Sequence, residues 1–136
     1  KIENGKVMIE SDNANKKIIS FVKTNAAHIK NMFAGLDKSF SYEMEICNVH
    51  FPMTVKVEGN KFVITNFLGE KQKRIAHIIN GVNVDVKGNK VIVSSHDTEA
   101  AGQTAANIER ITKISKRDRR VFQDGIFITK KPGAEE

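Results

Sequence analysis

The sequence lacks features that would define several common classes of protein. Cys47 is the only cysteine among 136 residues, so neither an internal disulfide nor a cysteine-based zinc cluster can form, and a reducing compartment is indicated. No apolar run approaches the roughly 20 residues that a membrane span needs, so no membrane partner is expected. The chain begins without a methionine or a signal peptide, and we expect it to be a fragment that has lost its natural N-terminus.

Signatures of catalysis are equally scarce. The four histidines, at positions 28, 50, 77 and 96, lack the close spacing typical of metal ligands. Ser95, His96 and Asp97 are adjacent, whereas a catalytic triad is assembled by geometry and not by adjacency in sequence. The triplet is better explained as an N-terminal cap of the helix that follows it. We therefore expect no enzymatic activity, no metal site and no cofactor.

Positive charge is present, and it is concentrated in one segment. Lys and Arg outnumber Asp and Glu by 22 to 16, which gives a net charge of +6. Residues 1–48 are nearly balanced, with seven basic and six acidic groups, whereas residues 110–131 hold eight basic and two acidic ones. Four of the five residues 116–120 are cations that repel one another, and folding gives little reason to cluster them. Neutralisation of phosphates supplies such a reason, so the pattern favours nucleic acid over a merely solvated surface.

The hydrophobic periodicity in the first part of the chain predicts a hairpin, a helix and a strand. Asn4-Gly5 is typical of a tight hairpin turn. Apolar residues recur at helical spacing from Ile18 to Phe33, and Gly35 is a plausible end of that helix. Alternation over residues 40–46 then predicts a half-buried strand.

Further along, short strands with regular turn signals predict an antiparallel sheet or a small barrel. A helix capped by Asp97 or Thr98 follows, and its apolar stripe runs from Ala101 to Ile111. Residues 126–128 supply a last strand.

The two halves of the chain share a pattern. In each, a Gly/Asn hairpin leads to a strand, then to a helix with an Ala-Ala-x-Ile motif, at residues 26–29 and 105–108, and then to another strand. This predicts an α+β fold of two tandem copies of a small antiparallel-sheet unit with one helix, the first copy being incomplete. The alternation breaks at His50-Phe51-Pro52. We therefore expect a truncated first repeat at residues 1–49 and a second, RNA-binding repeat at 50–136.

The second helix has a polar face beside a low ridge. Gln103, Asn107 and Arg110 share a face that turns away from the apolar stripe, and Gly102 and Ala106 let another backbone approach. Two interpretations stay open for this helix: hydrogen bonding to phosphates, sugars or base edges, or a solvated face with its ridge packed on the sheet.

The candidate RNA contacts extend from this helix into the basic segment and a second basic turn. They are Gly102, Gln103, Asn107, Arg110, Lys113, Lys116, Arg117, Arg119, Arg120, Lys71, Lys73 and Arg74. Phe122 is the one aromatic residue near these cations, and we expect it to pin the basic segment to the core. Binders of single strands use several aromatic rings as a platform, so structured RNA fits better. The alternative is a non-ribosomal adaptor whose basic loop binds an acidic protein.

Four motifs together resemble the archaeal and eukaryotic branch of the large-subunit ribosomal protein six family, the archaeal form being closer. They are His50-Phe51-Pro52-Met53, NFLGEK at 66–71, GQTAANIE at 102–109 and RDRRVFQDGI at 117–126, and the resemblance covers essentially the whole chain. It implies a structural protein of the large subunit in the cytoplasmic ribosome. The partners it implies are rRNA by the sarcin–ricin loop, neighbouring ribosomal proteins at the stalk base, and translational GTPases that dock nearby.

The resemblance also implies that the second domain makes the main rRNA contacts. Carried over residue by residue, it favours Gly102, Gln103, Asn107, Lys116, Arg117, Arg119 and Arg120. It is less specific for the basic turn at 71–74, because the family varies in charge there.

Overall fold

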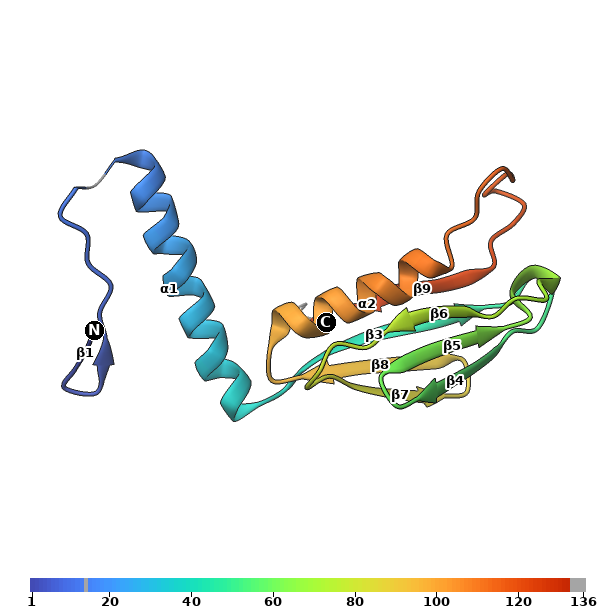
Figure 1. Cartoon of the computed structure of the whole chain (residues 1–136), viewed down its shortest axis with the longest axis horizontal. Helices are drawn as coiled ribbons and strands as arrows, with labels where there is room; N and C mark the ends of the chain where they lie inside the picture. The colour runs from blue at the N-terminus through green and yellow to red at the C-terminus, as the bar shows by residue number, and fades with distance from the viewer. Residues whose placement is uncertain (14, 133–136) are drawn as a thin grey trace.

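A computed structural model of the chain describes residues 1–13 and 15–132. The N-terminal part comprises the short strands β1 (Ile2–Glu3) and β2 (Lys6–Val7) and the long helix α1 (Lys16–Asp37) (Figure 1). After it come β3 (Phe40–Cys47), β4 (Thr54–Glu58), β5 (Lys61–Thr65), a 3-10 turn (Phe67–Gly69), β6 (Arg74–His77), β7 (Asn83–Lys87), β8 (Lys90–Ser95), α2 (Thr98–Ile111) and β9 (Gly125–Lys130).

The N-terminal hairpin and helix form as the sequence predicts. Asn4 and Gly5 have φ angles of 51° and 73°, which a tight hairpin turn requires. Asn15 caps α1, because its side chain accepts a hydrogen bond from the backbone N–H of Ile18. Figure 1 shows α1 leading away from the larger sheets. Its apolar stripe is accordingly left largely uncovered, and Phe33 is 58% exposed.

Gly35 lies inside α1, so the prediction that the helix ends there is wrong. The Nδ1–H of His96 donates a hydrogen bond to the carbonyl oxygen of Gly35 at 2.7 Å. A Cβ atom on Gly35 would lie only 2.0 Å from the carbonyl oxygen of His96. Glycine is therefore required because two backbones meet here, and the helix continues to Asp37.

The triplet at 95–97 is structural, as predicted. Asp97 caps α2 by accepting a hydrogen bond from the N–H of Glu99 at 3.0 Å. The Ser95 hydroxyl donates to the carbonyl oxygen of Gly81 at 3.0 Å. The ring of His96 bonds to α1 instead of to its two neighbours, so these side chains do not form a triad.

Strand β3 lies inside a four-stranded antiparallel sheet of order β7-β8-β3-β9. Met44 of β3 pairs with Val91 of β8 on one side and with Ile128 of β9 on the other. A division after residue 49 would separate β3 from both strands with which it shares its hydrogen bonds. The break in alternation at 50–52 lies in the loop that joins β3 to β4. In view of this pairing we propose a boundary after α1, and we call residues 40–132 the second unit.

A second antiparallel sheet, of order β4-β5-β6, and helix α2 complete the second unit. Helix α2 contacts β3, β8 and β9 of the first sheet and β6 of the second, and β4 lies beside β7. The fully buried side chains of Met44, Phe62, Phe67, Ile108 and Ile126 come from both sheets, the connecting turn and the helix. Each such side chain contributes about 1.5–3 kcal/mol on burial. The predicted α+β class with small antiparallel sheets is confirmed.

Small residues bring α2 close to the sheet. Ala101 and Ala105 are fully buried, and a Cβ atom on Gly102 would lie 2.8 Å from the hydroxyl oxygen of Tyr42 on β3. The ridge that the sequence indicated on this helix therefore packs partly on the protein itself.

Candidate nucleic-acid interface

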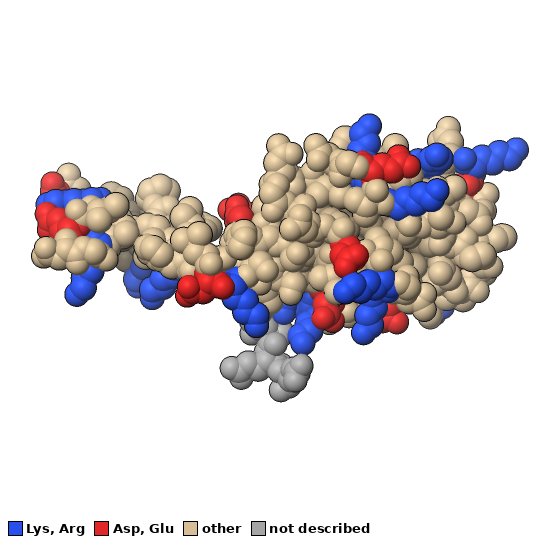
Figure 2. Space-filling model, turned by 90° about the horizontal axis from the view of Figure 1, so that it is seen from below, with Lys and Arg blue, Asp and Glu red and all other residues tan. Residues whose placement is uncertain are grey.

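The cations near the end of α2 lie on an irregular segment between that helix and β9, residues 113–124, here called the basic loop. Lys113, Lys116, Arg117, Arg119 and Arg120 are all exposed on it. The loop projects at the far end of the second unit (Figure 1), and Figure 2 shows Lys and Arg side chains reaching into solvent at that end. On the N-terminal part, in contrast, red and blue side chains lie close together (Figure 2). The positive charge is therefore local in space as well as in sequence.

A stack of side chains fastens the basic loop to the loop after β3. The rings of Phe122 and His50 stack with centroids 4.6 Å apart, and the guanidinium carbon of Arg117 lies 4.9 Å from the Phe122 centroid. The Nδ1 of His50 is 2.8 Å from a carboxylate oxygen of Asp124, whose other oxygen accepts a bond from the His50 backbone N–H at 3.1 Å. Phe122 thus pins the loop, in agreement with the sequence-based expectation.

Asp124 is the buried anchor of this stack, with an exposed fraction of 1%. Burial raises the pKa of its carboxyl. Hydrogen bonds from the His50 ring and from the backbones of His50 and Phe51 outweigh that effect, and the pKa lies below its ordinary value. This pair could not be predicted from local patterns, because its partners are 74 residues apart.

Within the loop, Asp118 shapes the backbone around the cations. Its carboxylate accepts a hydrogen bond from the backbone N–H of Arg120 at 2.9 Å and pairs with the Arg120 guanidinium at 3.2 Å. Hydrogen bonds from the side chain and backbone of Arg120 lower the pKa of Asp118. Because the Arg120 side chain is 91% exposed, this ion pair is weak and leaves the guanidinium open to an outside partner.

Arg74 joins the second basic turn to the end of α2. Its guanidinium pairs with both carboxylate oxygens of Glu70, donates to the carbonyl oxygens of Ile111 and Lys113, and lies 4.4 Å from the Phe67 centroid. The hydrogen bond from Arg74 lowers the pKa of Glu70 despite an opposing effect of burial. Arg74 is therefore engaged within the protein, while Lys71 and Lys73 next to it are exposed.

The polar face of α2 is organised as predicted. Gln103 donates to the side-chain oxygen of Asn107 at 2.9 Å, one turn further along, and Arg110 is exposed. Gly102 is the exception among the candidates on this helix, because Tyr42 covers it.

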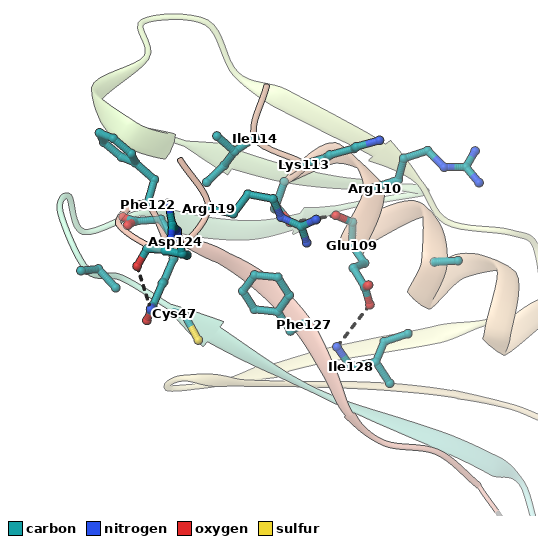
Figure 3. Close-up of a pocket in the computed structure, with 15 residues that line it drawn as sticks. Cys47, Glu109, Arg110, Lys113, Ile114, Arg119, Phe122, Asp124, Phe127 and Ile128 are labelled. Atoms are coloured by element: carbon teal, nitrogen blue, oxygen red, sulfur yellow. Dashed lines mark hydrogen bonds between the residues drawn. The ribbon is translucent and has the colours of Figure 1, made fainter. Parts of the chain in front are cut away.

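A groove of about 970 Å³ lies between the last turns of α2, the basic loop and β9. Figure 3 shows the ring of Phe127 in the middle of it, with Arg110, Lys113 and Arg119 along one side. Neither Phe127 nor Glu109, which also lines this groove, was singled out from the sequence, because the groove forms only when α2 and β9 come together.

Side chains from the end of α2 cover the outer edge of β9. The hydroxyl oxygen of Thr112 accepts a hydrogen bond from the backbone N–H of Ile126 at 3.2 Å. A carboxylate oxygen of Glu109 accepts one from the N–H of Ile128 at 3.3 Å (Figure 3). These bonds fix the position of the helix end against the strand, and so the shape of the groove.

Among residues 1–13 and 15–132, no group of three or more His, Cys, Asp or Glu side chains is placed to hold a metal ion. No helix in the same part of the chain is long and apolar enough to cross a membrane. The second unit is thus a small α+β domain that presents cations on a fixed loop, and this defines a class of binding proteins for anionic partners.

Comparison with known proteins agrees with this class. Residues 51–125 match the family Ribosomal protein L6. The chain is 49% identical over 133 residues to the large ribosomal subunit protein uL6 of Methanococcus vannielii, covering 98% of this chain and 73% of that protein. It is 48% identical to the protein of the same name from Haloarcula marismortui (96% and 74% covered) and 50% identical to that from Aeropyrum pernix (94% and 70%).

The chain belongs to the ribosomal protein L6 family, in its archaeal form, as the resemblance of its motifs predicted. Members of this family are structural proteins of the large ribosomal subunit and are not enzymes.

Proposed function

We propose that this chain binds large-subunit rRNA with the basic end of its second unit, close to the sarcin–ricin loop and the stalk base. In that position it braces RNA helices, contacts neighbouring ribosomal proteins and supports the surface on which translational GTPases dock. The chain belongs to a family of large-subunit proteins, so rRNA is the polyanion that its local positive charge is expected to bind.

The observation that carries the proposal is the hydrogen bonding of Arg74 to the end of α2. It brings Lys71 and Lys73 to the same end of the domain as the basic loop, so two cationic segments 40 residues apart form one surface. The positive charge of Arg117 also lowers the pKa of Glu70, because the basic loop lies near the turn that holds Glu70.

Specific roles follow for the exposed candidates. Lysines and arginines neutralise phosphates, with release of counterions, and the arginine forks also fix orientation. The proposed contacts are Lys71, Lys73, Gln103, Asn107, Arg110, Lys113, Lys116, Arg117, Arg119 and Arg120. Arg74 positions this surface from within, and Gly102 lets Tyr42 approach α2. The stack under the loop fixes its backbone before binding, which lowers the entropy cost of association.

The test is the affinity of the 136-residue chain for a large-subunit rRNA fragment that contains the sarcin–ricin loop, measured at several salt concentrations beside an unrelated duplex. We expect a preference for the rRNA fragment and a steep decrease in affinity as salt rises. Equal, weak binding to both RNAs would indicate generic attraction to polyanions. Absence of binding, together with capture of an acidic protein through the basic loop, would favour the adaptor instead.

A further inference from the structure

The groove beside the basic loop combines two properties that a site for bare phosphate would not need together. Its rim is cationic, whereas its floor exposes the aromatic ring of Phe127 beside the aliphatic side chain of Ile128. A phosphate is bound by charge alone, and an apolar floor adds nothing to its binding. A nucleotide presents both an anionic phosphate and a flat, apolar base face.

The accessible charge of the groove is positive. Arg110, Lys113, Arg119 and Arg120 line it. Within the described ranges, no acidic side chain forms an ion pair with the first three of these, and Arg120 pairs only with a carboxylate in the exposed loop. The lining also holds two acids. The carboxylate of Asp124 is buried against His50, and that of Glu109 accepts a hydrogen bond from the N–H of Ile128 within the groove, so the four cations outnumber the carboxylates.

The aromatic floor is held in place before any ligand arrives. A Cβ atom on Gly125 would lie 2.9 Å from the ring of Phe127, so the ring rests against the backbone of its own strand. Phe127 nevertheless stays 39% exposed, although Ile126 beside it is fully buried. A fixed, partly exposed ring costs little entropy when a base stacks on it.

The free aromatic surface sets the number of bases that the groove accepts. The groove volume of about 970 Å³ is at the upper end of the roughly 300–1,000 Å³ typical of sites for small organic ligands. Phe122, the other ring in the lining, already stacks on His50. One free ring stacks one base, so the groove fits a single nucleotide displaced from a structured RNA, and not a run of single strand.

We infer that this groove binds one unstacked nucleotide of the bound RNA, with its base on Phe127 and its flanking phosphates on Arg110, Lys113 and Arg119. This inference rests on the proposed function, since it identifies which part of the RNA enters the domain. It adds a base contact to a surface otherwise described by charge.

Substitutions of Phe127 test the inference by affinity for the rRNA fragment. Phe127→Leu keeps the apolar volume and removes the aromatic face, and we expect it to weaken binding roughly five- to fiftyfold with the salt slope unchanged. Phe21→Leu, on the exposed face of α1, is the matched control and should have no effect. Thermal unfolding of each variant shows that the fold is retained.

A second readout follows the groove itself. In the chain labelled with ¹³C at isoleucine methyls, a base stacked on Phe127 should shift the Ile128 methyl signals by its ring current, while those of exposed Ile19 on α1 stay in place. Binding of the rRNA with an unaltered salt slope, equal affinities for Phe127→Leu and Phe21→Leu, and unmoved Ile128 signals would overturn the inference and leave the proposed function standing. Loss of all preference for the rRNA would overturn both. Movement of Ile128 with an acidic peptide and not with RNA would replace the nucleotide by a protein partner.

Discussion

The carboxylate of Asp124 lies 2.8 Å from the ring nitrogen of His50, and this contact joins the end of the basic loop to the turn after β3. Phe122 stacks on the same histidine, and the exposed Arg117 lies over Phe122. The buried carboxylate of Asp124 therefore supports the positions of all three side chains. The conformation of the basic loop therefore depends on a side chain that is itself buried.

Asp124→Asn should lower the free energy of unfolding at pH 7 by about 1–3 kcal/mol, because a buried charge-assisted hydrogen bond is lost. The folded-state pKa of Asp124 lies below its ordinary value of about 3.9. The stability that it contributes is therefore present above pH 4 and disappears as the pH falls through the lowered value.

Urea unfolding of both proteins between pH 7 and pH 2.5 measures this effect. The difference in unfolding free energy should shrink steadily below pH 4. Asp12→Asn, at an exposed position, is the control and should change stability by less than about 0.5 kcal/mol. A difference that stays constant across the pH range would rule out the ionised carboxylate as its source.

Gly35→Ala should destabilise the chain by about 1–3 kcal/mol, although alanine normally stabilises a helix relative to glycine. The new Cβ would collide with the backbone of His96 and break the contact between α1 and the turn before α2. Circular dichroism during urea unfolding gives the comparison, with Asn31→Ala on the exposed part of α1 as control. A gain in stability for Gly35→Ala would show that the two backbones do not meet in solution.

Arg74→Lys should lower stability by about 1–2 kcal/mol, because lysine keeps the charge but loses the fork that reaches Glu70 and the end of α2 together. The exposed neighbour should differ, and Lys73→Ala is expected to change stability by less than about 0.5 kcal/mol. Unfolding of the two variants separates a cation that stabilises the fold from one that is free for the proposed RNA contact. Equal stability of the two would contradict that division.

The double variant Arg119→Ala, Arg120→Ala should weaken binding to the rRNA fragment and reduce the slope of log affinity against log salt by about one to two, since up to two phosphate contacts are lost. Its unfolding should be unaltered, because both side chains are exposed. Lys17→Ala with Lys30→Ala removes the same charge from α1 and should leave the slope in place. An unchanged slope in the loop variant would exclude these two arginines as contacts.

Local patterns in the sequence were sufficient for the secondary structure and for the charge. The Asn4-Gly5 turn, the cap at Asp97 and the strand over 126–128 each depend on residues within a few positions of one another. The same holds for the cations on the basic loop, because their clustering in a short stretch can be recognised without knowledge of the fold.

What local patterns could not predict concerns residues whose partners are distant in sequence. The pairing of β3 with β8 and β9 is one example. The side chains of β3 would alternate in the same way whichever unit the strand belonged to, so its sequence does not reveal its partners. Gly35 was interpreted as a helix end because His96 lies 61 positions away. Arg74 resembles any other surface cation until the carbonyl groups at the end of α2 approach it.

The coverage of β9 by Thr112 and Glu109 has a consequence for the protein when it is free in solution. An edge strand with unpaired N–H groups invites the edge of a second molecule, and the sheet then grows into an aggregate. On β9 the N–H groups of Ile126 and Ile128 are already occupied from α2. The side chains that shape the groove thereby also protect this edge of the sheet against self-association before any RNA is bound.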